Sequence, residues 1–356
     1  MILEILCAAA IGYQLLAILA CLAFRNQGPG PIGPKSAVSV LKPVHGVEPS
    51  MREAIASHTV LEGNYEFLCG VREGDPAIDL IARFPKARAV PVHTQTPNGK
   101  VGALIDLERE ARHALLVVND ADIRVETDYL LRVTAPLMNQ EVGLVTCLYR
   151  AEGSTFPARF ESLGIATDFA PSTLVARLVG VNNFAMGSTM AFRRLDLERI
   201  GGFEAIAGYL ADDYQLGRRI HALGLRCVLS DVIVTTHLAG DWNDVWLHQV
   251  RWARTIRVSN FWGYLGLPVT FATVWALLAL LSGSFVLAVA TLGARMLMAT
   301  TAGWGVLRSD DAMNLWLLIP ARDLFGFAVW IAGLFGDTVM WRGARLRLDR
   351  DGRILP

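Results

Sequence analysis

The sequence has no excess of charge of either sign, and it has little lysine. Its 356 residues contain 33 Lys and Arg against 33 Asp and Glu, so the formal net charge is zero. The lysines are Lys35, Lys42, Lys86 and Lys100. Non-specific nucleic-acid binding needs a broad basic field to neutralise phosphates. The composition therefore excludes nucleic acid as a partner.

The cysteines also form no pattern. The five of them lie far apart, and no CxxC pair is present. A disulfide framework or a zinc site is thereby excluded. We expect small, buried, apolar thiols, which fit a reducing, cytosolic compartment for the middle of the chain.

Apolar residues, in contrast, are abundant at 53%, above the roughly 45–50% of an ordinary soluble chain. This content excludes disorder and indicates membrane-embedded segments. All nine tryptophans lie after residue 241, and Trp concentrates at membrane–water interfaces. The last third of the chain therefore lies in different surroundings from the rest.

The N-terminal residues 2–24 carry a single charge, Glu4, and are long enough to span a hydrocarbon core of about 30 Å as a helix. A cleaved signal peptide is the alternative, but its basic start and small-residue cleavage site are missing. Arg25 follows the segment, so the positive-inside rule places the N-terminus outside and the next residues in the cytosol. A stiff linker follows at residues 28–34.

Two arrangements remain open for the C-terminal third. Residues 243–263 mix Trp with Arg, as an amphipathic helix at the headgroups does. No charged residue occurs in the 37 residues 258–294, a run that begins within this helix. This run is too long for one span. Either one span near 268–292 is joined to an interfacial piece, or a hairpin turns at Ser282–Gly283–Ser284. A last apolar segment, 313–336, contains Arg322 and Asp323, which are costly in a membrane unless they are paired.

Between these regions, short β-branched runs alternate with helical patterns, which predicts an α/β domain with a mostly parallel, doubly wound sheet. Ligands of such sheets bind beyond the carboxyl ends of the strands. The predicted strands are 37–41, 66–71, 87–92, 115–119 and 143–148. The main predicted helices are 51–61, 101–112, 128–138 and 210–223. The resulting division is an anchor at 1–24, the α/β domain at 36–242, an interfacial helix at 243–263, a transmembrane region at 264–341 and a basic cytosolic tail at 342–356.

Two acidic motifs are the main candidates for chemistry. Asp120 and Asp122 directly follow the strand at 115–119, where two carboxylates can hold Mg²⁺ or Mn²⁺ shared with substrate phosphates. The second pair opens the helix at 210–223. We expect Asp212 to cap that helix and Asp213 to act as a general base that removes a proton from an attacking hydroxyl.

The other candidates would bind substrate. Lys100 precedes a helix and can meet phosphates there. Glu73 or Asp75, after the second strand, can bind a uridine or ribose, although a solvated turn is the alternative. In the sequence His248 to Trp252, Arg251 would neutralise a diphosphate leaving group and Trp252 would pack over the acceptor. The alternative for this stretch is simple membrane-surface contact.

Taken in order, these motifs resemble the ceramide glucosyltransferase family, glycosyltransferase family 21, over nearly the whole chain. Matching stretches are 38–49, 74–79, Asp120–Asp122, Asp212–Tyr214 and the region from Arg322 to Arg345. The residues His248 to Trp252 match the family's (Q/R)xxRW motif, with His248 in place of the usual Gln or Arg. The compact, Arg-rich chain is most similar in overall character to bacterial hopanoid glycosyltransferases.

The resemblance implies a GT-A fold and an inverting, metal-dependent transfer from a UDP-sugar to a lipid hydroxyl, with Asp213 at the family's base position. The first expectation is N-acetylglucosamine transfer to a hopanoid, bacteriohopanetetrol, at the bacterial inner membrane. A ceramide glucosyltransferase is the alternative. Two further alternatives are a processive polysaccharide synthase and an inactive membrane scaffold.

Overall fold

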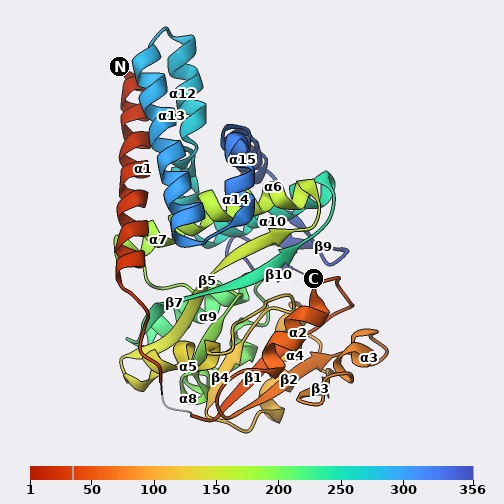
Figure 1. Cartoon of the computed structure of the whole chain (residues 1–356). Helices are drawn as coiled ribbons and strands as arrows, with labels where there is room; N and C mark the ends of the chain where they lie inside the picture. Colours follow the sequence, from red (N-terminus) through yellow and green to blue (C-terminus); the bar gives the residue numbers. More distant parts are fainter. Residues whose placement is uncertain (34–35, 356) are drawn as a thin grey trace. The chain divides into compact units, whose positions relative to one another are not determined.

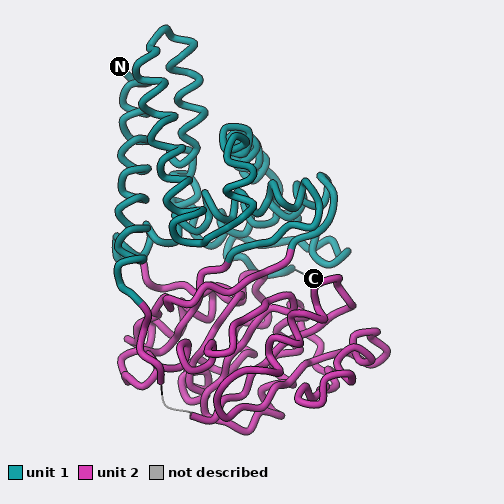
Figure 2. Tube along the Cα trace, in the orientation of Figure 1, with its two compact units in different colours: residues 1–28, 150–180, 238–355 teal, residues 29–149, 181–237, 356 magenta. Residues whose placement is uncertain are grey.

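The computed structural model describes residues 1–33 and 36–355. The chain divides into two compact units, coloured separately in Figure 2. Unit 1 comprises residues 1–28, 150–180 and 238–355, and unit 2 comprises residues 29–149 and 181–237 of the described chain. The linker expected at residues 28–34 spans the start of unit 2, and its last residue, Pro34, lies outside the described residues.

Unit 2 is built on a seven-stranded sheet in the order β3-β2-β1-β4-β6-β5-β7. The strands are β1 (Val38–Pro43), β2 (Tyr65–Val71), β3 (Ala87–Pro91), β4 (Leu115–Val118), β5 (Val142–Gly153), β6 (Met190–Arg193) and β7 (Arg226–Leu238). The four strands from β3 to β4 are parallel, and β6 is antiparallel to both β4 and β5. The result is the mostly parallel α/β sheet that the sequence predicted.

Helices cover the sheet of unit 2. They are α2 (Met51–Thr59), α3 (Ala77–Ile81), α4 (Gly99–Glu110), α5 (Tyr129–Thr134), η1 (Ala135–Met138), α8 (Arg194–Arg199), η3 (Phe203–Ile206) and α9 (Asp212–Ala222). Two buried apolar clusters fill the unit, one containing Val40, Phe67 and Val117 and the other Leu41, Leu68 and Val118. Alternate residues of β1 and β4 thus enter different clusters, as the period-2 geometry of a strand requires.

Unit 1 is mainly helical. Its helices are α1 (Ile2–Asn26), α6 (Phe156–Gly164), η2 (Ile165–Phe169), α7 (Ala170–Leu178), α10 (Trp242–Ser259), α11 (Phe261–Gly266), η4 (Leu267–Thr270), α12 (Ala272–Leu281), α13 (Phe285–Thr300), η5 (Thr301–Val306), α14 (Asp310–Asn314), η6 (Trp316–Leu318) and α15 (Ile319–Leu334). In Figure 1, α1 runs alongside α12 and α13. Cys7 of α1 packs there with Ala279 and Ala288.

Three helical stretches of the described residues are long and apolar enough to cross a membrane: Ile2–Asn26, Phe285–Val306 and Trp316–Leu334. A fourth is counted if the bent pair Phe261–Thr270 and Ala272–Leu281 is one broken span. The single span expected near 268–292 is wrong, because α12 ends at Leu281 and α13 begins at Phe285. Gly283, with a φ of +81°, makes the turn of the alternative hairpin, a conformation that glycine adopts without steric cost.

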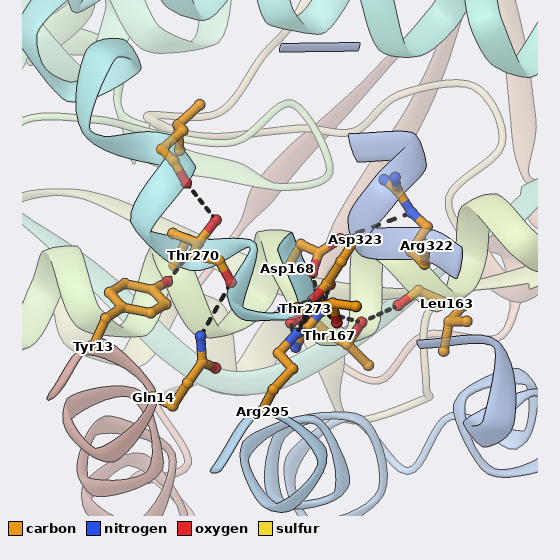
Figure 3. A network of polar contacts seen from close by, with 12 residues as sticks. Tyr13, Gln14, Leu163, Thr167, Asp168, Thr270, Thr273, Arg295, Arg322 and Asp323 are labelled. Carbon is orange, nitrogen blue, oxygen red and sulfur yellow. Dashed lines mark hydrogen bonds and ion pairs between the residues drawn. The ribbon is translucent and has the colours of Figure 1, made fainter. Parts of the chain in front are cut away.

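The charged residues within the apolar helices are paired, as the sequence analysis required. Arg295 of α13 is fully buried, and its Nη2 lies 2.7 Å from Asp323 Oδ1 of α15. Asp323 Oδ2 in turn accepts hydrogen bonds from the backbone and hydroxyl of Thr273 of α12 at 3.1 and 2.6 Å. Arg295 also donates to Thr167 and Asp168 of η2 (Figure 3). This network joins helices that are far apart in the sequence.

The C-terminal residues expected as a basic tail instead contribute most of a small antiparallel sheet in the order β10-β9-β8. Its strands are β8 (Thr338–Trp341), β9 (Ala344–Leu348) and β10 (Ile354–Leu355). Gly343 forms the β8–β9 turn with a φ of +78°. Alternation of Arg with Leu in β9 lets one face carry charge while Leu348 is buried.

Candidate active site

The candidate site of unit 2 lies where β4 ends. Asn119, the next residue, is completely buried, and its Nδ2 donates to Ser188 O, Tyr129 Oη and Thr189 Oγ1 at 2.7, 2.9 and 3.2 Å. Its backbone N–H donates to Leu41 O of β1. A buried amide with this many partners resists movement. The turn from Asp120 to Asp122 therefore starts from a rigid point.

Lys42 holds the same turn in place through hydrogen bonds to its backbone. This β1 side chain is fully buried, and its Nζ donates to the backbone oxygens of Asp120, Ala121 and Ile123 at 2.7, 3.2 and 3.2 Å. Burial lowers the pKa of Lys42 to about 8, although Asp122 and Asp120 oppose this shift. The ammonium group satisfies three carbonyls that would otherwise be costly to bury.

Lys100 pairs with a carboxylate from each acidic motif. Its Nζ lies 2.8 Å from Asp120 Oδ1 and 3.0 Å from Asp212 Oδ2. Burial lowers the pKa of Lys100, but the two carboxylates outweigh that effect and hold the pKa above its usual value. Helix α4 presents Lys100 here because Asn98 caps it, accepting from the backbone N–H groups of Lys100 and Val101 at 3.0 and 3.3 Å. The sequence predicted phosphate contact for Lys100, and this stays a prediction.

Gly187 links the two acidic motifs through its backbone. Its carbonyl accepts from the N–H of Asp120 at 3.2 Å, and its N–H donates to Asp213 Oδ2 at 2.8 Å. A Cβ at this position would lie 2.6 Å from Asp120 Oδ2 and 3.2 Å from Lys100 Nζ. A side chain here would force the Asp120 carboxylate to move, so glycine preserves this close approach between backbone and carboxylates.

The environment of Asp213 suits a base that works near neutral pH. Burial and the neighbouring Asp212 raise the pKa of Asp213 to about 6, while Lys100 and the N–H of Tyr214 oppose the shift. The N–H of Tyr214 donates to Asp213 Oδ1 at 2.7 Å. Both carboxylate oxygens are thus oriented by backbone donors, and the raised pKa matches the optimum for general-base catalysis. Asp212 is buried and bound to Lys100. It is the first residue of α9, whose N-cap is Ala211 without a side-chain cap hydrogen bond, so the expectation that Asp212 caps this helix is wrong.

The metal expectation rests on Asp120 and Asp122. The Asp120 side chain is 40% exposed, whereas Asp122 accepts a hydrogen bond from Thr236 of β7. Burial and Asp120 raise the pKa of Asp122. Within the described residues, no group of three or more His, Cys, Asp or Glu side chains forms a metal cluster. Two carboxylates fit a hard cation that completes its shell with phosphate oxygens and water, as Mg²⁺ commonly does.

Asp75 and Glu73 differ in their surroundings. Asp75 accepts from the N–H of Gly46 at 3.1 and 2.9 Å and from the N–H of Ala77 at 2.9 Å. It therefore organises the loop after β1 and the start of α3. Glu73 is exposed. Binding of a nucleoside by either residue stays a prediction.

The remaining predicted site residues, His248, Arg251 and Trp252, lie on α10 in unit 1. Asp241 and Asp244 form a capping box at the start of this helix. The His248 ring meets Trp252 edge-on, with 4.8 Å between ring centroids. The ring centroids of Trp252 and Phe169 lie 5.7 Å apart. Arg251 lines a cavity of about 180 Å³ together with Arg254 and Arg345. Roles of these residues in substrate binding stay predictions.

The sequence analysis did not identify Lys42, Gly187, Thr236 or Glu161. Lys42 carried one available signal, since a lysine in an otherwise apolar strand must find partners if the strand is buried. The others had no comparable signal, because their roles depend on which segments meet.

Comparison with solved structures shows the fold. A mannosyltransferase from Pyrobaculum calidifontis, solved with GDP-Man and Mn²⁺, superposes with a TM-score of 0.53 and 18% identity, covering 94% of this chain and 99% of that one. The expected GT-A-type α/β fold is thereby confirmed.

Sequence comparison identifies curated relatives. Ceramide glucosyltransferases 1 and 3 of Caenorhabditis elegans are each 29% identical, over 204 and 205 residues. Each match covers 54% of this chain and 44% of the relative, so the chain spans less than half the length of the curated proteins that it matches. The model of Glycosyl transferase family 21 matches residues 2–354, and the chain therefore belongs to that family.

Proposed function

We propose that this chain transfers one sugar from a UDP-sugar to the hydroxyl of a membrane lipid, with inversion at the anomeric carbon. The observation that carries the proposal is the cluster around Gly187. It joins a carboxylate with a raised pKa, Asp213, through the Gly187 backbone to the N–H of Asp120, whose side chain is partly exposed. Family membership and the curated relatives support the same type of reaction.

In the proposed reaction, Asp213 takes the proton of the acceptor hydroxyl. The hydroxyl oxygen then bonds to the anomeric carbon as the bond from that carbon to the diphosphate oxygen breaks, and the electron pair leaves with the diphosphate. No covalent intermediate on the protein is needed. Lys100 supplies a fixed positive charge to the diphosphate, and such preorganised charge is an effective form of catalysis. The predicted role of Arg251 is the same.

Asp120 and Asp122 would hold Mg²⁺ or Mn²⁺. A bound divalent cation would neutralise the charge that develops on the leaving diphosphate. Lys42 would support this binding by fixing the backbone of the turn that carries both carboxylates.

The lipid acceptor is supported by the apolar helices of unit 1. Three long, apolar helical stretches would keep the enzyme in a bilayer. The names of the curated relatives favour ceramide as the acceptor and glucose as the sugar. Neither of these two relatives supports the transfer of N-acetylglucosamine to a hopanoid that was expected from the sequence. That reaction is therefore tested alongside glucose transfer to ceramide.

The test is a transfer assay on purified protein in detergent with Mn²⁺. Labelled UDP-glucose and UDP-N-acetylglucosamine are each offered to ceramide and to bacteriohopanetetrol. We expect one labelled sugar on ceramide from UDP-glucose. Label on bacteriohopanetetrol alone would replace ceramide as acceptor, and a long glycan would favour a processive synthase. No transfer, together with no thermal protection by UDP and Mn²⁺, would favour an inactive scaffold and overturn the proposal.

A further inference from the structure

The apolar helix α15 lies along α10 within unit 1. In Figure 1 the two helices are neighbours. Near the start of α15, Arg322 Nη2 donates to Gln249 Oε1 of α10 at 2.8 Å. Further along, Val329 of α15 packs with Ala253 of α10 in one buried apolar cluster. The position of α15 relative to a membrane therefore follows the position of α10.

The end of α15 is also held by α10. The last carbonyls of a helix have no partner within the helix. Here the guanidinium of Arg257 donates to the carbonyl of Leu334, and Arg254 Nε donates to the carbonyl of Phe335 at 3.0 Å. Two arginines of α10 thus satisfy the carbonyls at the point where α15 stops.

The segment before α15 is tied to α6, which in turn contacts α10. Asp311 Oδ1 of α14 lies 2.7 Å from Arg159 Nε of α6. Glu161 Oε1, also of α6, lies 2.6 Å from His248 Nδ1 of α10 and accepts from Gln249 Nε2 at 2.7 Å. The chain before α15 and the chain after it are therefore held by the same pair of contacting helices.

Helix α10 carries charge along its length. Asp244 lies near its start, and Arg251, Arg254 and Arg257 follow over its second half. Such side chains are costly in the hydrocarbon of a bilayer. A helix that crosses a bilayer has its ends at opposite surfaces of a core about 30 Å thick. The contacts of both ends with one charged layer conflict with a crossing, although the stretch Trp316–Leu334 is long and apolar enough for one.

The outer face of α15 shows which partner it fits. A helix at a water-exposed surface turns its charged face outward and its apolar face to the core. In α15 the charged Arg322 and Asp323 are buried. The exposed positions, at spacings of three and four residues, are apolar: Leu317, Ala321, Leu324, Ala328, Ile331 and Phe335. An uncharged stripe on one side of a helix fits the acyl chains just below the lipid headgroups.

We infer that α15 lies in the plane of the membrane and does not cross it, with the stripe from Leu317 to Phe335 in contact with the acyl chains of one leaflet. The crossing segments are then α1 and the two arms of the hairpin at Gly283. Three crossings leave the sheet β8–β10 on the same side as α6 and α10. Its arginines agree with the cytosolic side under the positive-inside rule.

The first test measures depth in the bilayer. The five native cysteines are buried, so a spin label reacts selectively with a cysteine introduced at an exposed position. Leu317→Cys, Leu324→Cys and Ile331→Cys are labelled in the full chain in liposomes, and collision with oxygen and with a water-soluble nickel chelate reports the depth of each label. We expect three similar depths below the phosphates.

Two outcomes would overturn this placement. A helix rises about 1.5 Å per residue, so a crossing α15 would put the label at Leu324 about 10 Å deeper than the other two. Labels that are all open to the nickel chelate would instead exclude contact with acyl chains. Val286→Cys and Leu297→Cys on α13, both at exposed positions, are the matched control, since a crossing helix should separate their depths by about 10 Å.

The second test determines the side of the membrane. A membrane-impermeant maleimide is added to sealed vesicles of one orientation that contain Asp310→Cys, before α15, or Arg350→Cys, after it. Both should react from the same side as Asn243→Cys on α10, whereas Ser282→Cys at the hairpin should react from the other side. All four positions are exposed. Reaction of the first two variants from opposite sides would show that α15 crosses. Neither readout depends on sugar transfer.

Discussion

The ammonium group of Lys42 donates a hydrogen bond of 2.7 Å to the backbone carbonyl of Asp120. Two more carbonyls of the same turn share this ammonium group. The orientation of the proposed metal-binding carboxylates therefore depends on Lys42, the residue before the last one of β1. Within the part of the chain that the structure describes, no carboxylate pairs with this buried lysine, and its hydrogen bonds go to backbone oxygens of the turn.

Replacement of Lys42 by Met should weaken both stability and metal binding. Each buried carbonyl left without a donor costs about 1–3 kcal/mol, so the thermal midpoint should fall clearly. The affinity for Mn²⁺ in the presence of UDP, measured by calorimetry, should fall at a temperature where the variant is still folded. Lys86→Met, at an exposed position, is the control. Equal Mn²⁺ affinity in Lys42→Met and the wild type would contradict the supporting role.

Asp213→Asn should abolish transfer while the UDP-sugar still binds. The amide cannot accept a proton from the attacking hydroxyl, and loss of a general base costs about 10²–10⁴-fold in rate. Turnover is measured with saturating donor, and donor binding is measured separately by thermal protection. A variant that retains more than about a tenth of the wild-type turnover would exclude Asp213 as the base.

The pH dependence of transfer should show a rise at acidic pH. Asp213 acts in its ionised form, and its pKa is raised to about 6. Activity should therefore be low below that value and increase as the pH rises through it. In Asp212→Asn, loss of the neighbouring negative charge should move this rise to lower pH. A wild-type profile that is flat between roughly pH 5 and 7 would conflict with this assignment.

Gly187→Ala should impair catalysis more than folding. The added Cβ would lie 2.6 Å from Asp120 Oδ2, so the Asp120 carboxylate must move away from the position in which it pairs with Lys100. Misplacement by about 1 Å can cost about 10²-fold in rate, so kcat should fall by that order. Gly208→Ala is the matched control, since a Cβ there meets nothing within 4 Å. Comparable kcat values in the two variants would argue against the bridging role of Gly187.

Arg295→Met should destabilise unit 1 strongly. The substitution leaves Asp323 buried without its cation, and breaking a buried pair from one side costs about 3–5 kcal/mol. The measurement is the thermal midpoint in detergent. Additional replacement of Asp323 by Asn should recover part of the loss, because the uncompensated charge is removed. Arg347→Met, at an exposed position with an ion pair to Asp337, should have little effect. Equal midpoints for Arg295→Met and Arg347→Met would contradict the importance of the buried pair.

Local signals in the sequence predicted much of the fold. The β-branched runs at 115–119 and 66–71 became β4 and β2, and the helix expected at 210–223 is α9 (Asp212–Ala222). Such elements are set by residue periodicity, which neighbouring residues alone supply. The hairpin at Gly283 could be stated only as one of two alternatives, since an uncharged run of 37 residues contains no periodic signal that distinguishes one span from two.

Residue types and their spacing were enough to predict the family, the order of the acidic motifs and the apolar segments at both ends. The folded chain was needed to show that Gly187 joins Asp120 to Asp213, that Lys42 binds the turn, and that Glu161 holds His248. These contacts connect residues between 26 and 87 positions apart. Their existence depends on the order of strands in the sheet and on the packing of α6 against α10, which no local pattern encodes.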